Sequence, residues 1–194
     1  VPYLESPVQH VSSSVLKAMK PAGDSSYFKD LFALARELFP GLEIRTSFLL
    51  GFPGETEEDF RASMQLIERM QPDKVNLTRF SARPGTPAAR LYDMPDRIKK
   101  ERSREMTRLW QETAARRNER YVGEVLPALV TERGRDGTMK ARAENYQGIV
   151  VEGNPRLGSV INVQVTASNP FFLSGRLRPR SIAIEAYSSS LCLF

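Results

Sequence analysis

The sequence has very little of the chemistry that side chains use to hold metals or to form disulfides. Its 194 residues include one cysteine, Cys192, and one histidine, His10. A single cysteine excludes an internal disulfide framework and any cluster of cysteine metal ligands within this chain. One histidine equally argues against a histidine-based metal site. We therefore assign no metal ligand and no catalytic residue to this chain.

The sequence also lacks any long apolar run. No stretch approaches the roughly 20 apolar residues that a membrane span needs, and no secretory signal is present, so we expect a cytoplasmic protein without a membrane partner. Hydrophobic residues at 41% and charged residues at 26% are typical of a folded domain and exclude global disorder. The first residue is valine, and we interpret the chain as a fragment of a longer protein.

The charge balance favours an anionic partner only weakly. The chain has 28 Lys and Arg against 23 Asp and Glu, a net charge of +5. Because many basic proteins bind nothing acidic, the distribution of the charges matters more than their sum.

The first two thirds of the chain alternate between helix and strand patterns. A helix follows the capping residues at 24–26 and ends at Pro40-Gly41. The other expected elements are an opening strand at about 2–8, a strand at 42–50 whose closing residues suit burial on both faces, a helix from about 55 to 70, and a strand at 74–80. Such alternation predicts a parallel sheet with crossover helices.

A long charged helix is expected from about 95 to 121. Its apolar stripe comprises Ile98, Met106, Leu109, Trp110 and Thr113. We interpret its many basic residues as a solvated face with pairs four residues apart, and its alternative role is an RNA-binding surface.

Beyond Val122 the pattern changes to short alternating runs separated by glycines. The runs are 124–133, 138–145, 148–152, 159–167 and 171–178, and Asp136-Gly137 is a hairpin signal. Five short strands predict a small closed barrel of the kind that binds oligonucleotides. Of the neighbours Phe171 and Phe172, we expect one to face outward because alternate strand residues face opposite sides. Residues 181–194 follow no recognisable pattern.

Three loops follow the expected strands at one edge of the sheet. They are the loop that begins at Gln9-His10, the turn 51–55 and the loop 83–87. Ligands of parallel sheets bind at the carboxyl ends of strands, and glycines allow close backbone approach. The simpler interpretation is that these are plain turns, with Glu55 as a favourable charge in the first helical turn and His10 exposed to solvent.

Four stretches in order resemble the radical S-adenosylmethionine methylthiotransferases. They are Pro7-Val8-Gln9 with Val15–Lys20, Gly51-Phe52-Pro53-Gly54-Glu55-Thr56, Phe80–Ala89, and the barrel segment 121–177, which looks like a TRAM domain. The resemblance implies the carboxyl-terminal half of a partial (β/α) barrel over residues 1–120, a five-stranded TRAM β-barrel over 121–180, and a tail at 181–194.

Phrases such as Asn76–Ser81 and Arg142–Tyr146 look most like the archaeal and eukaryotic branch of that family. The resemblance implies methylthiolation of C2 of N6-threonylcarbamoyladenosine at position 37 of tRNA, with the anticodon stem-loop as partner. It also implies S-adenosylmethionine and two [4Fe-4S] clusters, whose cysteine ligands must precede Val1, so we expect this chain alone to be inactive. The alternatives are the branch that modifies a ribosomal protein, a non-catalytic RNA-binding module, and a TRAM-bearing RNA methyltransferase.

Two sets of site residues follow. By resemblance, six residues would contact S-adenosylmethionine: Gln9, Leu50, Gly51, Phe52, Phe80 and Arg83. On the barrel, we expect RNA contacts from four residues: Lys140, Arg142, Asn145 and Arg176. Lys140 and Arg142 are two apart and share a strand face, and the amide of Asn145 would reach a base edge or a 2′-OH.

Overall fold

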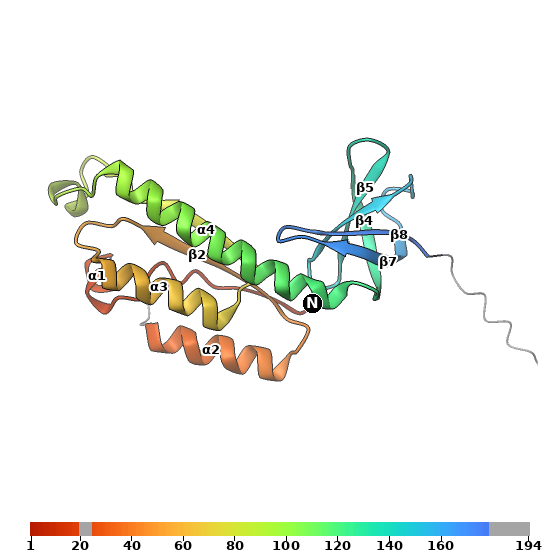
Figure 1. Ribbon diagram of the computed structural model, residues 1–194, viewed down its shortest axis with the longest axis horizontal. Helices are drawn as coiled ribbons and strands as arrows, with labels where there is room; N and C mark the ends of the chain where they lie inside the picture. Colours follow the sequence, from red (N-terminus) through yellow and green to blue (C-terminus); the bar gives the residue numbers. More distant parts are fainter. Residues whose placement is uncertain (20–24, 179–194) are drawn as a thin grey trace, which may run out of the picture.

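The computed structural model describes residues 1–19 and 25–178, and the expected tail at 181–194 lies outside them. The chain forms an α/β part and a β-barrel, and the long helix α4 (Asp96–Asn118) runs along the first part and leads to the second (Figure 1). No helix of the described ranges is both long enough and apolar enough to cross a membrane.

The α/β part is a three-stranded parallel sheet in the order β1-β2-β3, as the alternating pattern predicted. Its strands are β1 (Tyr3–Glu5), β2 (Glu43–Leu50) and β3 (Lys74–Arg79). Its other helices are α1 (Ser13–Met19), α2 (Ser25–Leu38) and α3 (Glu57–Met70).

Only one face of this sheet is covered by helices. In β2, Ile44, Phe48 and Leu50 are fully buried in the core that α2, α3 and α4 share, whereas the alternate residues Arg45 and Leu49 are half-buried. The expectation that the end of β2 is buried on both faces is wrong, because Leu49 on the second face is only half-buried. At the start of β2 the same face meets the barrel, where Arg45 lines a cavity with Arg142 and Tyr146.

The ends of α3 follow from local sequence. Thr56 caps the helix, with its hydroxyl accepting from the backbone N–H of Asp59 and its own N–H donating to the Asp59 carboxylate. Gln71 ends the helix in the left-handed conformation and is followed by Pro72, which cannot continue it.

The barrel confirms the predicted closed, five-stranded fold. Its strands are β4 (Val125–Arg133), β5 (Thr138–Ala143), β6 (Gly148–Glu152), β7 (Val160–Ser168) and β8 (Leu173–Leu177), in the closed order β4-β5-β6-β8-β7. β6 and β8 pair in parallel and the other neighbours pair antiparallel. The expectation for Phe171 and Phe172 is wrong: β8 begins only at Leu173, and both rings are exposed, so neither fills the barrel.

The barrel packs against the amino end of the sheet. Asn118, at the end of α4, donates to the Asn169 carbonyl at 2.7 Å, and the rings of Trp110 and Phe171 meet edge to face with centroids 5.5 Å apart. A second contact joins the barrel to the sheet: the ring centroids of Tyr146 in the barrel and Tyr3 in β1 are 5.1 Å apart. The carboxyl ends of the strands therefore lie far from the barrel (Figure 1).

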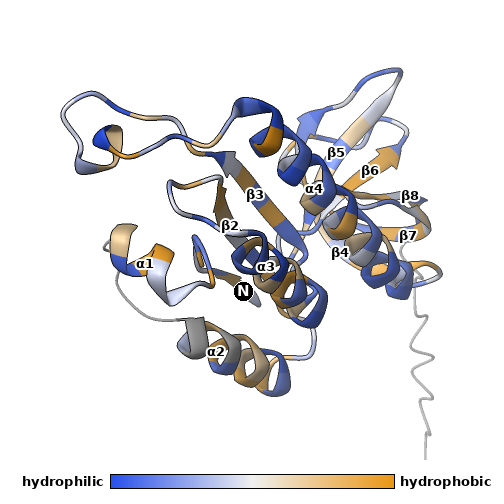
Figure 2. Ribbon diagram, turned by 60° about the vertical axis from the view of Figure 1, so that its left-hand side comes forward, coloured by the Kyte–Doolittle hydropathy of each residue, from blue (hydrophilic) through white to orange (hydrophobic). Residues whose placement is uncertain are grey.

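The buried side of α4 differs from the predicted apolar stripe. Met106, Trp110 and Thr113 are buried as expected, but the first part of the stripe is formed by Lys99 and Arg102, while Ile98 and Leu109 are only half-buried. The rest of the helix is largely hydrophilic (Figure 2). Lys99 and Arg102, which the sequence pattern placed on a solvated face, are therefore buried.

Candidate functional site

The carboxyl ends of the strands bring most of the predicted cofactor residues together. Gln9 forms a parallel bridge with Phe48 of β2, and the N–H of Phe80 donates to the Leu50 carbonyl at 2.8 Å. The rings of Phe52 and Phe80 meet at 5.2 Å. We call this edge, comprising Gln9, residues 50–52, Phe80 and the loop with Arg83, the carboxyl rim.

The side chains of the carboxyl rim differ in their access to a ligand. Leu50 is fully buried against the helices, so only its backbone is at the rim. Gln9 and Phe80 are half-buried, and Arg83 is exposed in the loop after β3. Gln9 adopts a positive φ of 64°, which turns the chain sharply after its bridge to β2.

Glu55 holds the turn at the rim from below. Its carboxylate accepts from the N–H groups of Gly51 and Phe52 and pairs with Arg102 Nη1 at 2.8 Å. Burial raises the pKa of this carboxyl, and Arg102 opposes the rise. The interpretation of Glu55 as a first-turn charge is wrong, because α3 begins at Glu57 and the Glu55 side chain is fully buried.

Lys99 closes the space beside the same turn. Its stem lies against Gly51, whose φ is 72° and where a Cβ would collide with the lysine Cγ. Its ammonium donates to the Phe80 carbonyl at 3.2 Å and pairs with Asp93 at 3.0 Å. Glu55 thus binds the backbone N–H groups of the turn, and the Lys99 stem packs against its glycine. Together these two side chains fix the conformation of the turn.

His10 is fully buried, so the expectation of an exposed loop histidine is wrong. Val8 and Val11 on either side of it are also buried in the core. The Nδ1 atom of His10 accepts a hydrogen bond from the Ser12 N–H at 3.0 Å. Its Nε2 lies 3.9 Å from the Glu55 carboxylate and has no hydrogen bond. Burial, with a smaller effect of Arg102, lowers its pKa to about 4, so the ring is neutral at pH 7.

Three of the four predicted RNA contacts share the outer surface of the barrel. Lys140 and Arg142 are exposed on β5, and the register of β5, β6 and β8 places Arg176 on the same side, beside Glu152. Lys140 pairs with Glu132 at 3.0 Å, and Arg142 donates to the Tyr146 carbonyl at 3.2 Å. We call this surface, with Lys140, Arg142 and Arg176, the barrel face.

The fourth residue requires a correction. Asn145 is buried, and its amide donates to the Tyr121 hydroxyl at 2.9 Å and to the Gly41 carbonyl at 3.4 Å, while its oxygen accepts from the Gln147 N–H. These bonds use the amide to join the barrel to the sheet. Asn145 therefore does not present a free amide to a base edge.

Sequence reasoning missed the charged residues beneath the rim. Glu55, Lys99 and Arg102 look like ordinary surface charges, but the last two precede Met106 and Trp110 at helical spacing. Continuing the buried side of the helix from Met106 toward its first residue would have predicted that Lys99 and Arg102 are buried. Buried charges need partners of opposite charge.

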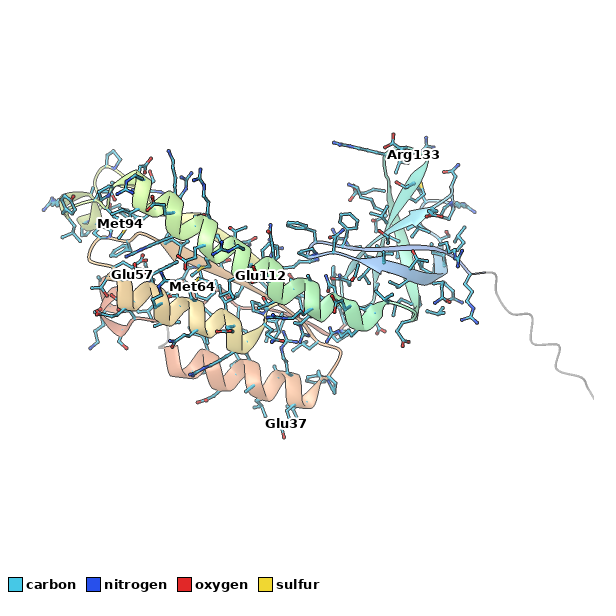
Figure 3. All side chains as sticks on the ribbon, viewed as in Figure 1. Glu37, Glu57, Met64, Met94, Glu112 and Arg133 are labelled. Carbon is cyan, nitrogen blue, oxygen red and sulfur yellow. The ribbon has the colours of Figure 1, made fainter. Side chains whose placement is uncertain are left out.

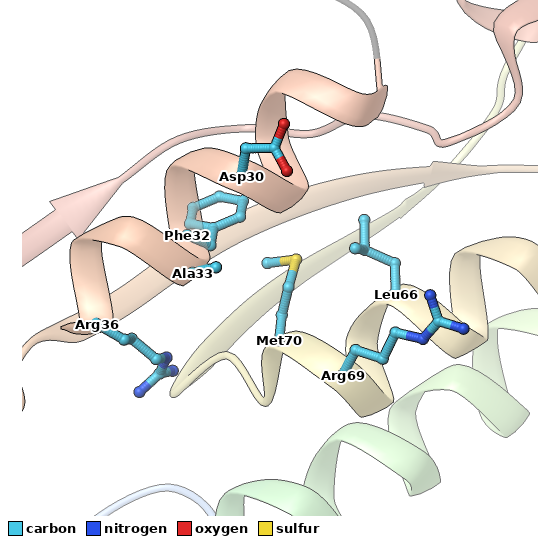
Figure 4. Close-up of a pocket in the computed structure, with 7 residues that line it drawn as sticks. All are labelled: Asp30, Phe32, Ala33, Arg36, Leu66, Arg69 and Met70. Atoms are coloured by element: carbon cyan, nitrogen blue, oxygen red, sulfur yellow. The ribbon is translucent and has the colours of Figure 1, made fainter.

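The α/β part also has a cavity away from the carboxyl rim. The cavity in Figure 4, about 310 Å³, lies between α2 and α3, and Arg36 beside it is held by the Gln71 carbonyl and Asp73. Figure 3 shows Glu57 at the rim end of α3 and Arg133 at the far tip of the barrel. Among residues 1–19 and 25–178, no group of three or more His, Cys, Asp or Glu could hold a metal ion.

A known domain family and several curated proteins match this chain. Residues 119–177 match the TRAM domain. The chain is 40% identical over 175 residues to a probable threonylcarbamoyladenosine tRNA methylthiotransferase of Archaeoglobus fulgidus, covering 90% of this chain and 41% of that protein. It is 41% identical over 180 residues to the ribosomal protein uS12 methylthiotransferase RimO of Leptospira biflexa, covering 90% and 40%. The chain thus spans about two fifths of the length of these curated relatives.

A solved structure of coproporphyrinogen III oxidase (HemN) from Escherichia coli, described as a Radical SAM enzyme, aligns with a TM-score of 0.48 and 13% identity. The alignment covers 86% of this chain and 41% of that one.

Proposed function

We propose that this chain is part of a methylthiotransferase, an enzyme that adds a methylthio group to C2 of N6-threonylcarbamoyladenosine at position 37 of tRNA. The observation that carries the proposal is the 40% identity to the Archaeoglobus tRNA methylthiotransferase, sustained over 90% of this chain. The barrel face supports an RNA substrate, because exposed Lys140, Arg142 and Arg176 suit phosphate contacts.

The carboxyl rim is the proposed place for S-adenosylmethionine. Of the six residues, Gln9, Phe80 and Arg83 keep accessible side chains, which offer an amide, an aromatic ring and a cation to a ligand with an adenine, a ribose and a carboxylate. Gly51 and Phe52 support the rim from below, since Glu55 occupies their N–H groups. S-adenosylmethionine, when bound, would supply the radical and the methyl group.

The described residues do not fit an iron–sulfur cluster. Such clusters are held by cysteine thiolates, and the one cysteine, Cys192, lies outside the described ranges. We therefore place both [4Fe-4S] clusters of the proposed enzyme on residues beyond this chain.

A second candidate is the modification of a ribosomal protein. The 41% identity to the Leptospira ribosomal protein uS12 methylthiotransferase favours it as strongly as the archaeal match favours tRNA. The basic barrel face is the reason that we place tRNA first.

A chimaera tests the choice. This chain would replace the matching two fifths of the Archaeoglobus protein, and the reconstituted chimaera would be offered tRNA carrying threonylcarbamoyladenosine and, separately, ribosomal protein uS12. Mass spectrometry of nucleosides and of uS12 peptides reads both products. We expect the methylthio product on the tRNA. Modification of uS12 alone would overturn the tRNA proposal, and no product from a chimaera that folds and holds its clusters would overturn both candidates.

A further inference from the structure

A polar cavity lies where the barrel meets the sheet. It has a volume of about 400 Å³ and is lined by five residues from both domains, which we call the junction cleft: Tyr3, Arg45, Lys74, Arg142 and Tyr146. The register of the sheet pairs Arg45 with Lys74, and Tyr3 lies on the neighbouring strand β1. The lining thus contains three cations, two phenol rings and no carboxylate.

The three cations of the junction cleft are poorly neutralised by the protein. Within the described ranges Lys74 has no ion pair, and the side chain of Arg142 has one hydrogen bond, to the Tyr146 carbonyl. Arg45 pairs with exposed Glu5 at 3.4 Å. Burial lowers the pKa of Lys74, and the charges of Arg142 and Arg45 lower it further. An anion in the cleft would relieve this mutual repulsion.

Of the nearby carboxylates, Glu5 is held by Arg45 and by the Tyr3 hydroxyl at 2.9 Å, and the other two do not neutralise Lys74. The charge of Glu43 raises the pKa of Lys74. However, burial and the charge of Asp73 raise the pKa of Glu43 itself to about 7, so Glu43 is only partly ionised at neutral pH. Asp73 is engaged by Arg36 at 3.2 Å and Arg117 at 2.9 Å. The cleft therefore keeps an excess of positive charge.

The two tyrosines add a surface for a flat ring. Their centroids are 5.1 Å apart with planes inclined by 47°, and Tyr146 is 50% exposed. Tyr146 adopts a φ of 65°, in the left-handed region, held by its N–H bond to the Ala143 carbonyl. Non-glycine residues rarely adopt this conformation, and such strain gathers at functional positions.

We propose that the junction cleft binds a single-stranded segment of RNA, with phosphates on Lys74, Arg45 and Arg142 and one base stacked on Tyr146. The proposal rests on the RNA substrate proposed above. Arg142 belongs to both the cleft and the barrel face, so a strand leaving the cleft continues toward Lys140. A combination of phosphate contacts with aromatic stacking is how proteins hold single strands. The α/β part thus shares in RNA binding with the barrel.

The test is the affinity of the full chain for a fluorescein-labelled single-stranded RNA of about ten nucleotides, measured by anisotropy over a salt series. We expect Lys74→Gln and Tyr146→Ala each to weaken binding by roughly 5-fold or more. Lys74→Gln should also lower the salt slope by about 0.7. Lys74→Arg should retain binding, and Lys17→Gln, a change on the distant helix α1, should leave it unchanged. Tryptophan fluorescence confirms that each variant is folded.

The outcomes separate the two proposals. If the parent chain does not bind RNA, the RNA substrate itself fails. If the parent binds but folded Lys74→Gln and Tyr146→Ala bind equally well, the junction cleft fails while the proposed function stands. Competition by inorganic pyrophosphate, or by an acidic peptide, at the same strength as unlabelled RNA would also overturn the cleft proposal, because a strand site requires the base as well as the charge.

Discussion

Replacing Arg102 with glutamine should destabilise the α/β part by a large, pH-dependent amount. Arg102 is 8% exposed and joins Glu55 at 2.8 Å and Glu57 at 3.1 Å, with its guanidinium over the Phe60 ring at 5.2 Å. Glu57 is 58% exposed and contributes at most about 1 kcal/mol. Glu55 is fully buried, and a buried charge that loses its partner costs about 3–5 kcal/mol. We expect a loss near 3–5 kcal/mol at pH 8.

The loss should shrink in acid. Burial already raises the pKa of Glu55 above its ordinary value, and removing Arg102 raises it further. In the window between the unfolded and folded pKa values the native state holds a proton that the unfolded state releases, so stability falls as pH rises. That pH window is wider in the variant, so the difference in free energy of unfolding between wild type and variant grows as pH rises. From pH 8 to pH 5 the loss should decrease by at least about 1 kcal/mol.

Urea unfolding followed by tryptophan fluorescence measures both values. Trp110 is the only tryptophan and is 8% exposed on α4, beside Phe171 of the barrel. The control is Arg97→Gln on the same helix, where the arginine is 78% exposed and paired with Glu101, and the expected loss is below about 0.5 kcal/mol. Equal losses for Arg102→Gln at pH 5 and pH 8 would refute the argument, because a packing defect does not titrate.

Three further predictions concern single features of the fold. Glu43 is buried with an unpartnered Oε1 and a pKa raised to about 7, so Glu43→Gln should stabilise the chain by up to roughly 3 kcal/mol at pH 8 and by almost nothing at pH 4.5; urea midpoints that do not move at pH 8 would contradict this. Gly175→Ala should cost about 2–3 kcal/mol in thermal unfolding, since its Cβ would lie 2.5 Å from Val163 Cγ1 and 2.6 Å from the Gln164 carbonyl, whereas Gly148→Ala, with 4.0 Å of clearance from Phe172, should cost less than about 1 kcal/mol. In hydrogen exchange the edge strand β1, which pairs only with β2, should exchange much faster than β5 and β6; equal protection would mean that β1 has a second neighbour.

Many of the elements were predictable from local patterns, because local sequence marks where they end or begin. Pro40-Gly41, Thr56 with Asp59, and Asp136-Gly137 lie where the structure ends or begins helices and turns. The barrel was predictable from the alternation of its strands, whose inward residues, such as Val151 and Val163, are fully buried. Its order, with β8 between β6 and β7, is a tertiary property that no short pattern contains.

The site was only partly predictable, since burial of a polar group depends on distant segments. The strand pattern placed the loops that begin at Gln9 and at Gly51 at one edge, and the bridge from Gln9 to Phe48 agrees with that placement. Nothing local distinguishes Asn145, which bonds to Gly41 from 104 positions away, from a free surface amide. His10 and Arg102 were misjudged for the same reason.

The helix α4 separates the two proposed binding surfaces, the carboxyl rim and the barrel face, by a fixed length. Its 23 residues extend about 34 Å from the carboxyl rim to the barrel. A ligand that touches both ends must therefore be a macromolecule, and a free nucleoside can occupy only one end at a time. Trimming the proposed tRNA substrate should thus produce a length threshold: fragments shorter than this helix would lose the contribution of the barrel altogether, however well their modified base suits the rim.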